Sequence, residues 1–206
     1  MSRAFSAVFA LLLALSVPTV AAAEGPVTQF LKGKHEQVNK LLKVPAKSTD
    51  ARDARDQKVT AIIGNLLDFR KLSQASLAEA WEERSAKERD EFVTLLQQLV
   101  ERNYKKNLEN TMEYTIKYVD EVPAKGEAVH VTTQARDAKN RRAPAVKIEY
   151  LLEPKGSDWA VVDVTTDGVS MVANYRSQFR RIMQKDGWGG LLDRMRKRLD
   201  EGTDVL

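Results

Sequence analysis

Two side chains in this sequence have the type and setting for acid–base chemistry: His130 and Asp163. His130 alternates with valines and Asp163 interrupts an apolar run, so either is a candidate general base in an apolar pocket. A carboxylate in such a run needs hydrogen-bond partners, so the main alternative for Asp163 is structural, as a cap or as the partner of an arginine. His35 lies in a polar stretch of a predicted helix.

Other catalytic constellations are missing from the sequence. It has no cysteine, and its two histidines have no clustered third ligand, so neither a thiol nucleophile nor a zinc site is predicted. Gly187, Gly189 and Gly190 lack the spacing of a phosphate-binding loop and indicate a break between helices. We therefore expect a binding protein rather than an enzyme, with no metal and no cofactor.

The first 23 residues have the three parts of a secretory signal peptide. Arg3 supplies a positive charge, residues 4–17 are apolar, and the small residues 21–23 follow a break at Pro18. The apolar run is shorter than the roughly 20 residues that span a bilayer, so cleavage after Ala23 is predicted rather than anchoring. Because the sequence has no cysteine, we expect the mature chain to carry neither a lipid anchor nor a disulfide.

The mature chain, residues 24–206, is long enough for one domain with its own core. The whole sequence has a net charge of +4, but acidic and basic residues alternate along it. Nucleic-acid binding usually requires a basic stripe interleaved with aromatic side chains, and the sequence has none. We therefore expect a single-domain monomer that does not bind nucleic acid.

Apolar residues three and four positions apart predict helices over residues 24–110. These helices are expected at residues 24–43, 50–68, 72–83 and from 86 to about 108. The last of them begins with a capping box formed by Ser85 and Glu88.

The spacing then becomes alternating, which predicts strands over residues 111–167. Four strands joined by short turns are expected at residues 113–119, 129–133, 146–152 and 159–166. Helices follow within residues 168–201, with a break at Gly187. This order predicts an α+β fold in which a curved antiparallel sheet of about four strands carries helices on one face.

A dense motif spans the last predicted strand and the helix after it. Its residues are, in order, Trp159, Val161, Asp163, Val164, Asp167, Gly168, Val169, Ser170, Val172, Asn174, Tyr175, Arg176, Gln178 and Phe179. This ungapped pattern resembles the MlaC family, the toluene-tolerance auxiliary proteins of ABC transporters. The likeness continues more loosely upstream, through Trp81 and Ser85, and covers nearly all of the mature chain. Asp68-Phe69 stands where family members usually carry a Phe-Asp pair.

The resemblance implies a non-enzymatic periplasmic carrier whose cargo is a phospholipid. Family members hold acyl chains in an apolar pocket between the sheet and the helices. They shuttle lipid between an outer-membrane lipoprotein complex and an inner-membrane ABC transporter with an MCE-domain protein, and so maintain outer-membrane lipid asymmetry.

A carrier of this kind needs a dry pocket. Each methylene moved from water to an apolar site contributes about 0.8 kcal/mol, so two chains of roughly fifteen methylenes favour burial by roughly 20 kcal/mol. The residues that the sequence offers for the pocket are Leu95, Leu99, Ile116, Tyr118, Val131, Ile148, Tyr150, Leu152, Val162, Val164, Val169, Val172, Tyr175 and Phe179. The same spacing is typical of a filled core, so periodicity alone leaves that alternative open.

Several motif residues have two interpretations. Gly168 either permits a tight turn or lies at the mouth of the pocket. Tyr175 either packs in the core or lines the pocket, and Arg176 either pairs with Asp163 or contacts lipid phosphate. The arginines at 141–142 are expected at a solvated hairpin tip.

Two other functions remain open from the sequence. One is an enzyme with a cone-shaped α+β fold that acts on a small apolar substrate through Asp163 or His130. The other is a periplasmic interaction module that has a filled core and binds no lipid.

Overall fold

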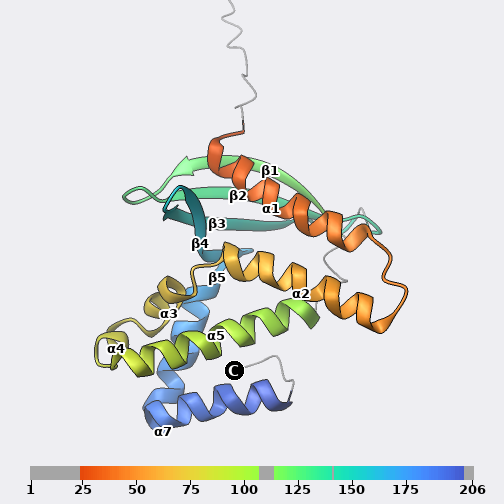
Figure 1. Ribbon diagram of the computed structural model, residues 1–206. Coiled ribbons are helices and arrows are strands. Elements are labelled where there is room, and N and C mark those ends of the chain that lie inside the picture. The colour runs from red at the N-terminus through yellow and green to blue at the C-terminus, as the bar shows by residue number, and fades with distance from the viewer. Residues whose placement is uncertain (1–23, 107–113, 141, 202–206) are drawn as a thin grey trace, which may run out of the picture.

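The predicted order of helices, strands and helices is confirmed in the computed structural model, which describes residues 24–106, 114–140 and 142–201 (Figure 1). The predicted signal peptide and Arg141 lie outside these residues. Within them, no helix has both the length and the apolar character needed to cross a membrane.

The helical half begins the described chain. Its members are α1 (Pro26–Lys43), α2 (Thr49–Leu66), α3 (Phe69–Leu77), α4 (Glu79–Glu82) and α5 (Ala86–Lys106). The predicted capping box starts α5, because Ser85 N–H donates to the Glu88 carboxylate at 2.8 Å and Glu88 N–H donates to the Ser85 hydroxyl at 3.3 Å. The Asp68 carboxylate caps α3 by accepting from Lys71 N–H at 3.0 Å.

The prediction of one helix over residues 72–83 is wrong. Ala78 has a φ of 52°, in the left-handed region, and separates α3 from α4. Alanine is the best helix former, so its residue type gives no sign of the break. After the break Trp81 is buried, only 3% exposed, in the core between the helices.

The sheet is an antiparallel meander in which neighbours in sequence are neighbours in space. Its strands are β1 (Tyr114–Pro123), β2 (Val129–Asp137), β3 (Val146–Lys155), β4 (Asp158–Thr166) and β5 (Val169–Ser170). The prediction that the sheet ends at Gly168 is wrong, because φ values of 46° at Asp167 and 84° at Gly168 turn the chain back onto β4. The turn interpretation of Gly168 is confirmed, and the final helix starts at Met171.

The C-terminal helix α7 (Met171–Glu201) consists of two segments that meet at Gly187. Gly187 has φ 68° and ψ −173°, a conformation that is essentially restricted to glycine, so the predicted break is confirmed. Figure 1 shows the second segment running along α5 on the side away from the sheet.

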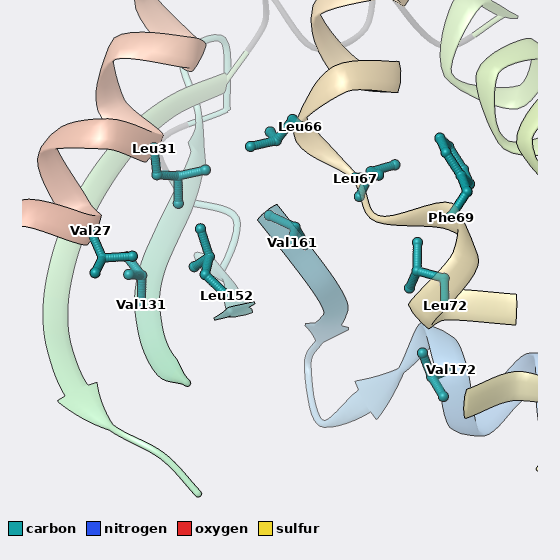
Figure 2. Close-up of a cluster of buried hydrophobic side chains, with 10 residues drawn as sticks. All are labelled: Val27, Leu31, Leu66, Leu67, Phe69, Leu72, Val131, Leu152, Val161 and Val172. Atoms are coloured by element: carbon teal, nitrogen blue, oxygen red, sulfur yellow. The ribbon is translucent and has the colours of Figure 1, made fainter. Parts of the chain in front are cut away.

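The core has three clusters of buried apolar side chains. The first core cluster joins α1, the sheet, the α2–α3 junction and the start of α7 (Figure 2): Val27, Leu31, Leu66, Leu67, Phe69, Leu72, Val131, Leu152, Val161 and Val172. The second core cluster joins α3, α4, α5 and α7: Leu77, Trp81, Phe92, Leu95, Leu96, Phe179, Ile182, Leu191, Leu192 and Met195. The third core cluster joins α1 to α2: Val38, Leu42 and Val59.

Candidate functional site

One face of the sheet packs against α1, and we call it the inner face. Val131 and Leu152 lie on it and belong to the first core cluster, which α1 enters through Val27 (Figure 2). Val131 pairs with Tyr150, and Tyr150 pairs with Val164, so their side chains share this face. Side chains on alternate positions of each strand therefore build a continuous apolar surface.

Part of the inner face is only half-buried. Ile116 and Ile148 precede Tyr118 and Tyr150 by two positions, so they lie on the same face. Both isoleucines are half-buried and belong to none of the three core clusters. Tyr118, Tyr150 and Val164 are half-buried as well and pack against the first core cluster. These five side chains form an apolar surface that its neighbours cover incompletely.

Polar side chains lie within this apolar surface. His35 Nδ1, from α1, is 2.6 Å from the Tyr118 hydroxyl. The His35 ring centroid lies 5.9 Å from that of Tyr118 and 5.8 Å from that of Tyr150. On the same face, the Thr133 hydroxyl donates to the backbone carbonyl of Ile148 at 3.3 Å. A hydrogen bond therefore links α1 to β1 within the apolar surface, and the Tyr150 ring lies beside the same imidazole.

We call His35, Tyr118 and Tyr150 the tyrosine cluster. A further phenol, that of Tyr104 on α5, packs against the third core cluster instead. Burial lowers the pKa of His35 to about 4 and raises that of Tyr150 to about 12. Burial also raises the pKa values of Tyr104 and Tyr118. At neutral pH the cluster therefore offers only uncharged hydrogen-bonding groups.

The predicted pocket residues do not include His35, although its spacing from buried residues of α1 indicates that it faces the sheet. The helix α1 buries Leu31 and Val38, and His35 follows the first by four residues and precedes the second by three. Such spacing places all three side chains on one helix face. The charged neighbours Lys34 and Glu36 make the local sequence polar and hide this relation.

The structure separates the predicted pocket residues into two regions. The inner face holds Ile116, Tyr118, Val131, Ile148, Tyr150, Leu152 and Val164. Leu95 and Phe179 belong to the second core cluster, and Leu99 and Tyr175 pack against it. Tyr175 stacks on Phe179 with ring centroids 5.4 Å apart and ring planes 3° apart. These four residues therefore lie among helices and not on the inner face.

The remaining three predicted pocket residues have separate positions. Val172 enters the first core cluster from α7. Val162 is buried as the extra residue of a β-bulge, since Leu152 pairs with Val161 while Leu151 pairs with Asp163. Val169 is 62% exposed, because the turn at residues 167–168 places it on the short outer strand β5. Val169 is therefore separate from the buried apolar surface.

The carboxylate of Asp163 caps the start of α7. It accepts hydrogen bonds from the Val164 N–H at 2.8 Å, the Ser170 hydroxyl at 2.6 Å and the Val172 N–H at 3.1 Å. Three donors satisfy a carboxylate in this half-buried setting and complement the positive end of the helix. The capping role predicted for Asp163 is confirmed.

The alternative pairing of Asp163 with Arg176 is wrong. Arg176 Nε and Nη2 both donate to the carbonyl oxygen of Ala75, at 2.9 and 2.7 Å, and so tie α7 to α3. His130 alternates with Val131 along β2, so it points to the face opposite the inner face. Asp163 and His130 therefore form no catalytic pair with the tyrosine cluster. Among the described side chains, no group of histidines and carboxylates could hold a metal ion.

Two open hollows lie away from the inner face. One, of about 460 Å³, runs between α2 and α5 and is lined by small and polar side chains that include Thr60, Gly64 and Gln97. The other, of about 330 Å³, lies between α4 and α7 beside Arg84 and Trp188. None of the predicted pocket residues lines either hollow. The inner face thus remains the site at which the predicted residues and the tyrosine cluster meet.

Comparisons with known proteins agree with this architecture. A family model described as MlaC protein matches residues 32–197. A solved structure of a phospholipid-binding protein from Ralstonia solanacearum, in complex with a phospholipid, has a similar fold with a TM-score of 0.70. That likeness has 21% sequence identity and covers 86% of this chain and 98% of that chain. No curated protein matches the sequence.

Proposed function

The chain belongs to the MlaC family, and from this membership we propose that it is a phospholipid-binding carrier of the periplasm. The family match over residues 32–197 is the observation that carries the proposal. The similar Ralstonia solanacearum protein supports it, because that protein holds a phospholipid on the same fold.

The inner face is the surface on which we propose that acyl chains bind. Ile116, Ile148 and Val164 are apolar and half-buried there, so a ligand chain can complete their burial. The second core cluster is different, because Phe92 packs edge-to-face on Phe179 with centroids 5.3 Å apart and both are 0% exposed. We therefore assign Leu95 and the other predicted residues of that cluster to the packed core.

The transport role extends this proposal from binding to movement. It includes export to the periplasm, which the predicted signal peptide supports, and a mature chain without a lipid anchor, which the lack of cysteine supports. An untethered protein can diffuse between two membranes with its cargo shielded from water. The proposed partners are an outer-membrane lipoprotein complex and an inner-membrane ABC transporter with an MCE-domain protein, as the resemblance implies.

An enzymatic role finds less support. The Asp163 carboxylate is engaged by three hydrogen bonds that fix the start of α7, which is a structural task. His130 lies on the opposite side of β2 from Val131 and the inner face. The two residues on which catalysis was predicted to depend are thus not positioned to act on a ligand of the inner face.

The proposal is tested by the lipid content of the exported protein. Protein purified from the periplasm without detergent is extracted, and the extract is identified by mass spectrometry alongside the intact complex. We expect phospholipid in a fixed ratio to protein, and uptake of phospholipid from liposomes after the protein is stripped. A protein that is reproducibly empty and takes up none contradicts the proposal and favours an interaction module with a filled core.

A substitution on the inner face tests where the chains bind. Ile148→Trp adds bulk to the half-buried surface, and overpacking costs about 1–3 kcal/mol, which in binding is a loss of roughly 5- to 150-fold. Val119→Trp is the matched control, because Val119 on β1 is 49% exposed. We expect liposome uptake to fall for Ile148→Trp and to persist for Val119→Trp. Equal uptake by the two variants would mean that the acyl chains do not bind on the inner face.

A further inference from the structure

The hollow between α4 and α7 lies away from the inner face and is lined by Ala80, Glu83, Arg84, Arg180, Met183, Gln184 and Trp188. We propose that this hollow is a docking site for an acidic segment of a partner protein, whose carboxylates bind Arg84 and Arg180. The inference goes beyond the proposed function, because docking here does not depend on bound lipid. Figure 1 shows α4 and the bend of α7 on the side of the helices away from the sheet.

The first argument is that Arg84 is fixed in place and still has unused donors. It lies in the turn between α4 and α5, and its guanidinium carbon is 5.0 Å from the centroid of the Trp188 ring. Its Nε donates to the Ala80 carbonyl at 3.2 Å and its Nη2 to the Glu83 carboxylate at 2.8 Å. A guanidinium has five N–H donors, so three of them have no acceptor among the described residues. Because these contacts already hold the side chain, binding a carboxylate costs little further side-chain entropy.

The acidic side chains of α4 and its end leave the hollow positively charged. The Glu83 side chain is 67% exposed, and an ion pair at that exposure contributes little to stability, so an incoming carboxylate can compete with it. Glu82 is paired with Arg89 at 3.3 Å, and Glu79 does not line the hollow. The lining therefore has two guanidinium groups and one carboxylate.

The second argument is an excess of unpaired cations beside the hollow. Arg180, Arg181 and Lys185 are exposed on the first segment of α7. None of their charged groups forms an ion pair or a side-chain hydrogen bond with a residue that the structure describes. Arg181 and Lys185 are four residues apart, so they form a row on the helix surface next to the row of Arg180 and Gln184. Such a surface attracts an acidic partner and slows its dissociation.

The third argument is shape, which favours a protein segment over a membrane surface. The hollow has a volume of about 330 Å³, and Met183 and Trp188 supply apolar parts of its lining. A concave site of this kind accepts a side chain that projects from a peptide, whereas a lipid surface is broad and cannot enter it. A carboxylate binds a guanidinium through two parallel hydrogen bonds, and small apolar neighbours in the peptide match the rest of the lining.

The test measures the binding of a defined acidic peptide to the exported protein. The probe is a short fluorescent peptide in which glutamate alternates with alanine, and its control has glutamine in place of every glutamate. We expect fluorescence anisotropy to show binding of the acidic peptide alone, with an affinity that falls as salt is added, because salt screens exposed charges. Equal binding of the two peptides, or no binding of the acidic one, overturns the proposal.

Two matched substitutions locate the bound peptide. Arg180→Gln removes one unpaired charge from the hollow, and Arg52→Gln removes one exposed charge from α2, outside the hollow. We expect Arg180→Gln to weaken binding of the acidic peptide about three- to tenfold, as the loss of one charged hydrogen-bonding group gives. Arg52→Gln should weaken it by less than about twofold. Equal weakening in the two variants means that binding follows net charge, and overturns the site.

The same samples separate docking from lipid binding and from membrane contact. Uptake of phospholipid from liposomes should be unchanged in Arg180→Gln, because no residue of the inner face lines the hollow. If Arg180→Gln weakens co-sedimentation with phosphatidylglycerol vesicles but leaves peptide binding unchanged, the surface contacts a membrane and the docking proposal is overturned. Failure of the wild type to take up lipid overturns the carrier proposal and leaves the result for the acidic peptide intact.

Discussion

His35 shows at the residue scale how position changes the chemistry of a side chain. Exposed on a helix, this imidazole would titrate near pH 6.5. Held between α1 and the sheet beside Tyr118 and Tyr150, it has a pKa of about 4, because burial disfavours its charged form. The neighbouring phenols stay neutral over this range, so His35 links the stability of the inner face to acidity.

The sign of that linkage gives a prediction. Between pH 6.5 and 4 the unfolded chain protonates His35 while the folded chain does not, so stability is full above pH 6.5 and falls as pH drops toward 4. The loss reaches about 3 kcal/mol. We expect the decrease in the free energy of unfolding from pH 7 to pH 4, measured by urea titration, to be smaller by about that amount in His35→Gln.

His130→Gln is the control for this measurement, because His130 lies on the other face of β2. It should retain the pH dependence of the wild type. If His35→Gln and the wild type lose stability in parallel as the pH falls, His35 is not buried in its neutral form.

At the scale of elements, α7 depends on a single residue for its change of direction. Gly187 has φ 68° and ψ −173°, and a Cβ there would meet no atom within 4 Å, so only backbone conformation restricts this position. Gly189, two residues later, also has open space around it but lies in the helical segment without a positive φ. Substitutions at these two glycines can therefore be compared to distinguish the effect of backbone strain from that of packing.

We expect Gly187→Ala to lower the free energy of unfolding by about 1–3 kcal/mol, because an alanine is strained in that region of backbone space. Gly189→Ala should be neutral or stabilise by up to about 1 kcal/mol, since alanine is the better helix former. Thermal and urea unfolding of both variants measure the difference. Equal stabilities would mean that α7 does not turn at Gly187.

At the scale of the whole molecule, cargo and fold should stabilise each other. A ligand that binds only the folded state adds about 2.7 kcal/mol at one hundred times its Kd. In a domain of this size each kcal/mol raises Tm by roughly 2–4 °C. We therefore expect reloading of stripped protein with phospholipid at that excess to raise Tm by roughly 5–10 °C in scanning fluorimetry. The Ile148→Trp variant should show a smaller rise, and an unchanged wild-type Tm would contradict binding to the folded state.

Much of the fold could be predicted because local patterns express it directly. The capping box at Ser85, the break at Gly187 and the four long strands follow from residue type and spacing. The short strand β5 was missed, although Asp167-Gly168 is a sequence typical of a tight hairpin turn. The break at Ala78 could not be predicted, because alanine favours a continuous helix. An alanine with positive φ carries no signal in the sequence.

The candidate site was only partly predictable for a related reason. Apolar periodicity identified Tyr118, Ile148 and Tyr150, which the structure brings to the inner face. The same periodicity also selected Phe179, which the structure buries in a helical core, and overlooked His35. Spacing tells which side chains share a face of one element, but not which other element covers that face.

The sequence by itself determined the class of fold, the family and most of the elements, because these depend on short-range spacing and on an ordered motif. Only the tertiary structure decided that Asp163 is a helix cap, that Arg176 binds the carbonyl of Ala75, and that His35 lies against Tyr118 and Tyr150 within an apolar surface. Each of these three roles depends on partners distant in sequence or on a chain reversal. Which residues become partners depends on how whole elements pack, and not on the residues that neighbour them in the sequence.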